Sequence, residues 1–165
     1  MDAMKFGIGL WEVGTFELGN EVDVTDPCYD KDVRCRETLK CKPGEYTAFV
    51  KVADTGDWGN RVEYIAIYKD GDTTIGQNGD MDIVAYIGVD AGCAGFFNNK
   101  PDFADNEWYD FVDKMNPNHN NTYLVSYGAF SDSGYGDGCY DVYANEDRTA
   151  FAIRFIESEF DNIFD

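Results

Sequence analysis

Short runs in which apolar and polar residues alternate recur along most of the chain. They are rich in β-branched and aromatic residues, and clusters of Gly, Asn, Asp or Pro separate them. Because successive side chains of a strand point to opposite faces, this pattern is typical of half-buried strands. It predicts strands at 45–52, 61–68, 82–89, 122–130, 139–144 and 149–156. Further strands or a bent hairpin are expected at 5–11 and 15–24, with turns or bulges at Gly14 and Gly19. The sequence therefore predicts a mainly β (α+β) fold, an antiparallel sheet that is sandwich- or barrel-like.

One segment, at about 102–115, breaks the alternation. Its apolar residues follow helical spacing, Asp102 can cap its start, and Asn116-Pro117 stops the run. We predict one amphipathic helix there, with its apolar stripe packed on the sheet. A chain of 165 residues with 44% hydrophobic residues can bury its own core, so we expect residues 1–165 to form a single domain.

The five cysteines and the absence of long apolar runs bear on location and cofactors. The cysteine count is odd, no C-x-x-C pair is present, and the N-terminal sequence lacks the regions of a signal peptide. These features predict a cytoplasmic protein with reduced thiols and no membrane partner. We expect neither a metal site nor any other cofactor.

Negative charge is the largest anomaly of the composition. The net charge is −19, divided into −4 over residues 1–69 and −15 over residues 70–165. Such a field repels phosphates and anionic membranes and attracts basic proteins. The sequence therefore predicts no direct nucleic-acid binding and favours a partner with a basic surface, although acidic residues that merely solvate the surface are the alternative.

Two loops have unusual compositions. SGYGDG, at 133–138, lacks the features of a P-loop or a dinucleotide fingerprint. We interpret it as a tight loop in which Gly134, Gly136 and Gly138 supply positive φ and Asp137 binds nearby backbone amides. The second loop, at 69–82, holds acidic side chains that calcium could use, but not in the order of an EF-hand.

Catalytic residues are scarce. The only histidine, His119, lies in the polar segment NPNHNN, and no two carboxylates are singled out as an acid–base pair. Cys28 and Cys35 lie nearest to the basic Lys31, Arg34 and Arg36, so they are the first candidates for a nucleophile. We assign no catalytic residue and favour a protein that is not an enzyme.

Four motifs, VDVTDPCY (22–29), GDWGNR (56–61), GVDAG (88–92) and SGYGDGCYDVYA (133–144), carry a resemblance. Together they resemble a family of uncharacterised small proteins from bacteriophages, prophages and Gram-positive bacteria. Its elements are DPCY near the N-terminus, VDxG in the middle and GDGxYxVY near the C-terminus. The family is a domain of unknown function, so the resemblance implies a source and a β-rich fold but no chemistry.

Two sets of residues follow as candidates for function. Residues of the motifs either tie down turns through side-chain to backbone bonds or line one ligand pocket: Asp26, Cys28, Tyr29, Trp58, Asp90, Asp137 and Tyr140. A second set forms an acidic partner-binding surface: Asp70, Asp72, Asp80, Asp82, Asp102, Asp105, Glu107, Asp110, Glu157, Glu159 and Asp161.

Three functional hypotheses come from these observations. The first is a phage-encoded, non-enzymatic inhibitor that binds a host nucleic-acid-handling defence protein, such as a CRISPR nuclease, by nucleic-acid mimicry. The second is a small-molecule or nucleotide-signal sponge, in which basic side chains of the stretch 31–42 meet a phosphate: Lys31, Arg34, Arg36, Lys40 and Lys42. The third is a hydrolase that uses a carboxylate pair or Cys28.

Overall fold

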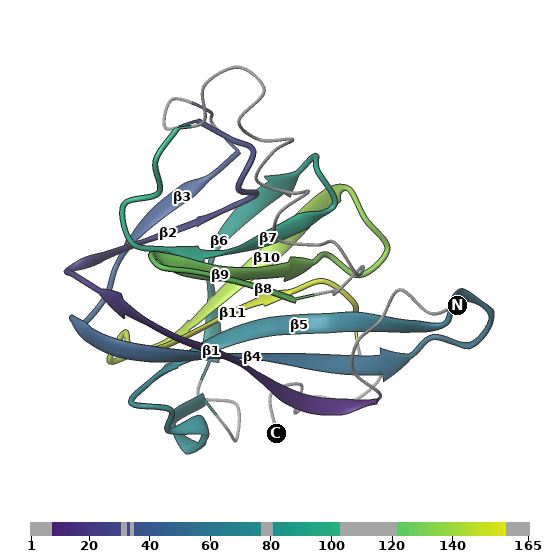
Figure 1. The fold of residues 1–165 in the computed structure, drawn as a ribbon, viewed down its shortest axis with the longest axis horizontal. Coiled ribbons are helices and arrows are strands. Elements are labelled where there is room, and N and C mark those ends of the chain that lie inside the picture. The colour runs from purple at the N-terminus through teal and green to yellow at the C-terminus, as the bar shows by residue number, and fades with distance from the viewer. Residues whose placement is uncertain (1–7, 31–32, 34, 77–80, 103–121, 158–165) are drawn as a thin grey trace.

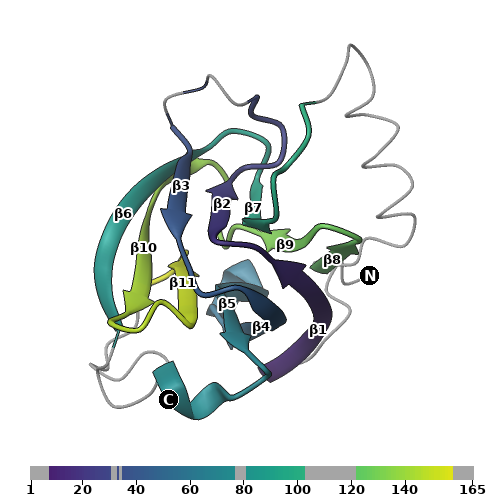
Figure 2. The ribbon, with the colours of Figure 1, turned by 90° about the vertical axis from the view of Figure 1, so that its left-hand side faces the viewer.

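The fold is a sandwich of two antiparallel sheets, as the alternation predicts (Figures 1 and 2). The computed structural model describes residues 8–30, 33, 35–76, 81–102 and 122–157. The larger sheet has six strands in the order β1 (Gly9–Leu18), β4 (Gly44–Asp54), β5 (Asn60–Lys69), β11 (Ala150–Arg154), β10 (Gly138–Asn145) and β6 (Met81–Val89). The smaller has five, in the order β3 (Glu37–Lys40), β2 (Glu21–Thr25), β7 (Cys93–Phe97), β9 (Gly128–Asp132) and β8 (Thr122–Val125).

The core lies between the two sheets. Alternate residues of each strand enter it, so that Val22 and Val24 of β2 share one buried cluster with Ile65 and Ile67 of β5. Smaller clusters lie on the outer faces, one with Tyr64 and the other on β7 and β9. Several strands therefore bury both of their faces, and the chain has more apolar residues than the core between the sheets alone would hold.

Two strands were not predicted. β7, with the sequence CAGFF, buries both of its faces and therefore shows no alternation. β3, with the sequence ETLK, is short and half exposed, and Leu39 is its single apolar contact with the core. The apolar pattern of each strand is too close to that of a loop for the sequence to predict a strand there.

Turns account for the other differences. The predicted strand 122–130 is two strands, β8 and β9, which a tight turn at residues 126–127 joins into a hairpin. The turn or bulge expected at Gly14 is a bulge, with a register shift between Glu12 and Gly14 in the β1–β4 pairing. The strands expected at 5–11 and 15–24 are therefore wrongly divided, because β1 continues through Gly14 and the break comes at residues 19–20, before β2. The helix predicted at about 102–115 falls on residues outside the described part, apart from Asp102, and stays a prediction.

The four sequence motifs lie in or next to connections between strands, and some of these connections cross from one sheet to the other. The chain changes sheets after β1, β3, β6 and β9, while short 3-10 turns, η1 (Gly56–Trp58) and η2 (Thr73–Gly76), lie in connections that follow β4 and β5. Two of the four motifs contain a crossing, 88–92 between β6 and β7 and 133–144 between β9 and β10. The motif 22–29 ends in the connection from β2 to β3, and the motif 56–61 contains η1. We call these four segments the motif end: residues 26–29, 56–61, 88–92 and 133–138. In Figure 1 the β4–β5 connection lies at the far right, the β6–β7 and β9–β10 connections lie at the upper right, and the segment after β2 lies at the top.

Candidate functional site

Hydrogen bonds and one aromatic contact link the four motifs of the motif end to one another. Asp26 binds the backbone of residues 90 and 91, and the amide of Ser133 donates to the carbonyl oxygen of Gly92 over 3.0 Å. Arg61 and Trp58 then contact the loop around Gly134 and Tyr135. Four segments that are far apart in sequence therefore form one connected surface.

Asp26 holds the first two motifs together. Its side chain is fully buried, and one carboxylate oxygen accepts hydrogen bonds from the amides of Asp90 (2.7 Å) and Ala91 (2.6 Å). The other oxygen accepts from the amide of Cys28 over 2.9 Å. Three backbone donors around one carboxylate satisfy its burial. Asp26 thus ties a turn after β2 to the crossing from β6 to β7.

Tyr140 and Ser133 hold the SGYGDG loop. The hydroxyl of Tyr140 donates to the carbonyl oxygens of Ser133 (3.1 Å) and Gly136 (2.5 Å), and the hydroxyl of Ser133 also donates to Gly136 over 2.6 Å. Gly134 (φ 68°) and Gly136 (φ 117°) have the positive φ that we predicted.

Two details of the loop prediction are wrong. Gly138 is the first residue of β10 and does not have a positive φ. Asp137 is exposed, and the side-chain hydrogen bonds that fix this loop come from its neighbours Ser133 and Tyr140. The hydrogen bond from Tyr140 to Ser133 spans seven residues, and no sequence pattern predicts such a bond. An aspartate between glycines, such as Asp137, suggests a turn even where its side chain makes no hydrogen bond to the loop.

Trp58 and Tyr135 form an exposed aromatic pair on two loops of the motif end. Their ring centroids are 6.3 Å apart at an interplanar angle of 72°, and their exposed fractions are 68% and 56%. Beneath them, Arg61 donates from Nε to the carbonyl oxygen of Trp58 (3.0 Å) and from Nη1 to that of Gly134 (3.4 Å). Arg61 therefore joins the β4–β5 connection to the SGYGDG loop.

The chemistry of Cys28 does not suit a nucleophile. Burial, followed by a hydrogen bond to Asp26 and the charges of Asp26 and Asp90, raises the pKa of the Cys28 thiol to about 12. A thiol with this pKa carries almost no thiolate at neutral pH. Burial, followed by the charges of the same two aspartates, also raises the pKa of Tyr29 to about 12. All five cysteines are free thiols.

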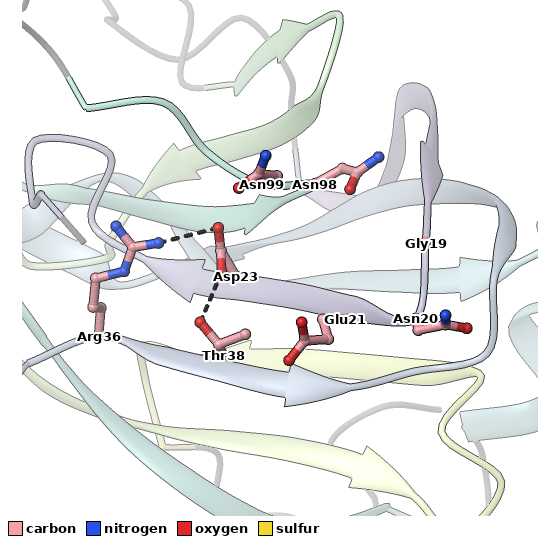
Figure 3. Close-up of a pocket in the computed structure, with 8 residues that line it drawn as sticks. All are labelled: Gly19, Asn20, Glu21, Asp23, Arg36, Thr38, Asn98 and Asn99. Carbon is pink, nitrogen blue, oxygen red and sulfur yellow. Dashed lines mark hydrogen bonds and ion pairs between the residues drawn. The ribbon is translucent and has the colours of Figure 1, made fainter. Parts of the chain in front are cut away.

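A polar pocket of about 420 Å³ opens beside β2 and β3 (Figure 3). Its walls are Gly19, Asn20, Glu21, Asp23, Arg36, Thr38, Asn98 and Asn99. Arg36 and Thr38 point toward Asp23, with Arg36 Nη2 3.1 Å from Asp23 Oδ2 and Thr38 Oγ1 2.8 Å from Asp23 Oδ1. The Asp23 and Arg36 side chains are only 9% and 5% exposed, which makes this a buried ion pair.

Further bonds fix the same ion pair in place. The backbone amide of Lys100 donates to Asp23 Oδ2 over 2.9 Å, and Arg36 Nη1 donates to the carbonyl oxygen of Tyr29 over 3.2 Å. Arg36, which we had considered as a phosphate ligand, is therefore already paired with a carboxylate. Sequence reasoning missed Asp23, although an aspartate between two valines in a predicted strand is a signal that a buried charge needs a partner.

The acidic candidates are spread over the surface. Asp70, Asp72, Asp82, Asp102 and Glu157 are exposed. Two of them have local partners, since Lys69 Nζ lies 3.2 Å from Asp70 and the amide and hydroxyl of Thr74 donate to Asp72. The others lie outside the described residues: Asp80, Asp105, Glu107, Asp110, Glu159 and Asp161.

Exposed carboxylates gather at the end of the sandwich away from the motifs. Glu17 of β1 lies directly opposite Glu45 of β4, and the amide of Asp70 donates to the carbonyl oxygen of Glu45. Asn145 donates a hydrogen bond to the carbonyl oxygen of Ile75, in the connection after β5. This bond places the exposed Glu146 and Asp147, which follow Asn145, at the same end as Asp70 and Asp72. We call this set the acidic end: Glu17, Glu45, Asp70, Asp72, Asp82, Glu146 and Asp147.

In the part of the chain that the structure describes, no group of three or more His, Cys, Asp or Glu side chains is placed to hold a metal ion, and no helix is long and apolar enough to cross a membrane. His119 lies outside that part. No family model, curated protein or solved structure matches the chain. The case for a function therefore depends on surface chemistry.

Proposed function

We propose that this protein is a non-enzymatic inhibitor that acts in the cytoplasm by binding the basic surface of a nucleic-acid-handling protein. The single observation that carries the proposal is the imbalance of exposed charge. Among the lysines and arginines that the structure describes, Lys40 and Lys42 alone are exposed. The exposed acids within the same ranges are Glu12, Glu17, Glu21, Glu45, Asp54, Asp57, Asp70, Asp72, Asp82, Asp90, Asp102, Asp137, Glu146, Asp147 and Glu157.

The imbalance begins with the composition, 32 acidic residues against 13 lysines and arginines, and it grows because several basic side chains bond within the fold. Arg36 pairs with Asp23, Arg61 binds two backbone carbonyls, and Arg154 Nε donates to the carbonyl oxygen of Ile156. Carboxylates then dominate the field around the protein. That field raises the rate of encounter with a basic surface and repels nucleic acid.

Rigid strands and tied turns support mimicry in particular. Apart from Asp102 and Glu157, the exposed carboxylates of the described residues belong to antiparallel strands or to their short connections, so the backbone spacing between them is fixed before binding. A fixed array of negative charges can occupy the groove in which a basic protein holds phosphates. The resemblance of the motifs to phage proteins supports a bacterial host, and it favours a defence enzyme, such as a CRISPR nuclease, as the partner.

A quantitative binding experiment tests this proposal. Tagged protein captures partners from a nuclease-treated bacterial extract, and the partner is identified by mass spectrometry, purified and titrated in increasing NaCl. We expect a 1:1 complex that duplex DNA displaces and that weakens steeply with salt. A variant with Asp70→Asn, Asp72→Asn, Glu146→Gln and Asp147→Asn is expected to bind at least tenfold more weakly, roughly 0.4 kcal/mol or more per charge.

A control variant reverses the sign of the change. Lys40→Gln with Lys42→Gln removes the two exposed cations and makes the protein more acidic, so its complex is expected to be as tight or tighter. If both variants weaken binding equally, or if the complex is unchanged in about 1 M NaCl, the charge mechanism is wrong.

The polar pocket supports a second candidate function, a sponge for a small polar signal. About 420 Å³ and a lining of amides and carboxylates suit a small hydrophilic ligand. Arg36 is held by Asp23, so a phosphate would compete with a buried carboxylate. Thermal unfolding with a panel of nucleotides separates the two candidates, because a ligand in excess raises the melting temperature of its receptor. If no nucleotide of the panel raises the melting temperature, the sponge function is wrong.

A further inference from the structure

We propose that Trp58 and Tyr135 form a docking site for an arginine side chain of a basic protein partner. This inference rests on the proposed function, and it names a place on the surface where the partner is held. The sequence motifs GDWGNR and SGYGDG supply one aromatic residue each. Packing between β-strands does not need either ring, because both lie in connections and both are largely exposed.

Folding leaves much of the apolar surface of both rings in contact with water. Trp58 is 68% exposed and Tyr135 is 56% exposed, although their rings are in edge contact with each other. Large aromatic side chains that stay in water on a folded protein mark interaction sites more often than isolated aliphatic ones do. Trp, Tyr and Arg are also the residues most enriched where binding energy is concentrated.

The loop that carries Trp58 is fixed before any partner arrives. The amide of Gly56 donates to Asp54 Oδ1 over 2.9 Å, and the hydroxyl and amide of Thr55 both donate to the carbonyl oxygen of Gly59. Gly56 and Gly59 have φ values of 72° and 80°, which other residues rarely adopt. The turn therefore presents the indole without a loss of backbone freedom on binding.

The loop that carries Tyr135 is fixed in the same way. Two hydroxyls, those of Ser133 and Tyr140, donate to Gly136, and Gly134 packs closely on the chain around Phe155. Arg61 joins this loop to the first one by its bonds to Trp58 and Gly134. The distance between the two rings is thus set by the scaffold.

Charge selects a cation as the occupant. Three exposed carboxylates, Asp54, Asp57 and Asp137, lie in the same two loops. Arg61, the cation nearest to the pair, directs two of its nitrogens at backbone carbonyls. An aromatic face combined with nearby carboxylates attracts a guanidinium, which stacks on rings as well as pairing with acids, more than it attracts an ammonium.

Fluorine NMR on protein labelled with 5-fluorotryptophan tests the site directly. The chain has three tryptophans, and Trp58→Phe assigns the resonance of Trp58. The probe is a nona-arginine peptide, with nona-lysine as the matched control. We expect nona-arginine to shift the Trp58 resonance at concentrations where nona-lysine shifts it little.

Variants of the second ring separate stacking from simple charge attraction. Tyr135→Phe keeps the ring and is expected to keep the shift, whereas Tyr135→Ala is expected to lose it and to weaken peptide binding about fivefold. Thermal unfolding of each variant checks that the fold is intact. Peptide binding that leaves the Trp58 resonance unmoved, or that is the same in Tyr135→Ala, overturns the inference.

The two proposals fail in different ways. If neutralising the acidic end abolishes binding of the host partner but nona-arginine does not shift the Trp58 resonance, the proposed function stands and the docking site is wrong. If Trp58 responds to nona-arginine but no basic partner responds to the acidic end, the docking site stands and the proposed function is wrong.

Discussion

Asp26 and Asp90 are bonded neighbours in the fold, yet their side chains have different surroundings. The Asp26 side chain is fully buried and accepts three backbone hydrogen bonds, whereas Asp90 contributes its own amide and keeps its side chain exposed. At the scale of the residue, the same side-chain chemistry therefore has a structural role at one position and is available to solvent at the other.

Substitution of the two aspartates separates these roles. Asp26→Asn places an amide donor among three amide donors, so at least one loses its acceptor, and we expect the free energy of unfolding to fall by about 3 kcal/mol. Asp90→Asn should change it by less than about 0.5 kcal/mol, as exposed substitutions do. Urea denaturation followed by circular dichroism measures both. Equal effects of the two substitutions would contradict the role of Asp26.

The thiol of Cys28 makes a prediction about reactivity. Its pKa is raised to about 12, whereas Cys35 and Cys139 are exposed. Because the thiolate is the reactive form, we expect iodoacetamide at pH 8 to alkylate the exposed pair first and Cys28 only after unfolding in urea. Peptide mass spectrometry reads the order. Rapid alkylation of Cys28 in the folded protein would restore it as a candidate nucleophile.

The same thiol links stability to alkaline pH. Between the ordinary pKa of 9.0 and the folded pKa of about 12, the folded protein keeps a proton that the unfolded chain has released. The folded state thus binds more protons, and the free energy of unfolding falls as pH rises through this window. Burial also raises the pKa of Cys41 to about 11, which adds in the same direction. We expect Cys28→Ala to show a shallower decline in urea titrations.

At the scale of the element, β7 and β9 approach each other unusually closely. A Cβ on Gly95 would overlap the carbonyl oxygen of Ala129 and lie 2.5 Å from the Cα of Phe130. Backbone cannot move aside as a flexible side chain can, so this position is restricted to glycine by its neighbour rather than by its φ angle.

Gly95→Ala is therefore expected to be severe. We predict a loss of about 3 kcal/mol in the free energy of unfolding, because the β7–β9 pairing must shift to admit a methyl group. Gly19→Ala is the matched control, since nothing lies within 4 Å of its Cβ position. Thermal unfolding of both variants measures the difference. A stable Gly95→Ala variant would show that the two strands can separate without cost.

Sequence patterns predicted those strands whose faces differ in environment. The alternation identified β4, β5, β6, β10 and β11. It could not identify β7, because Phe96 enters the core while Phe97 packs into a second cluster on the outer face. In the candidate site, composition drew attention to Asp26 and Tyr140, but their partners depend on which turns meet in space, and spacing along the chain does not contain that information.

At the scale of the whole molecule, exposed carboxylates outnumber exposed cations in the described residues, and some carboxylates face each other. Glu17 lies opposite Glu45 across a strand pair, a placement that costs stability. Because repulsion among exposed carboxylates is screened by salt, we expect the melting temperature to rise from about 10 mM to about 500 mM NaCl.

Neutralising the acidic end tests this expectation. The variant that carries Asp70→Asn, Asp72→Asn, Glu146→Gln and Asp147→Asn should gain less from added NaCl than the wild type, because fewer charges remain to be screened. Scanning calorimetry at both salt concentrations gives the comparison. A melting temperature that falls with NaCl would mean that favourable ion pairs outweigh the repulsion.

The position of β11 affects how the chain is made. This strand is the last of the described strands in the sequence, yet it lies in the middle of the six-stranded sheet, between β5 and β10. Until it is synthesised, no strand pairing joins the group β1–β4–β5 to the group β6–β10 within this sheet. The six-stranded sheet is therefore complete only once β11 has been synthesised, and a ribosome that stalls before β11 leaves two open sheet edges exposed to proteases and to aggregation.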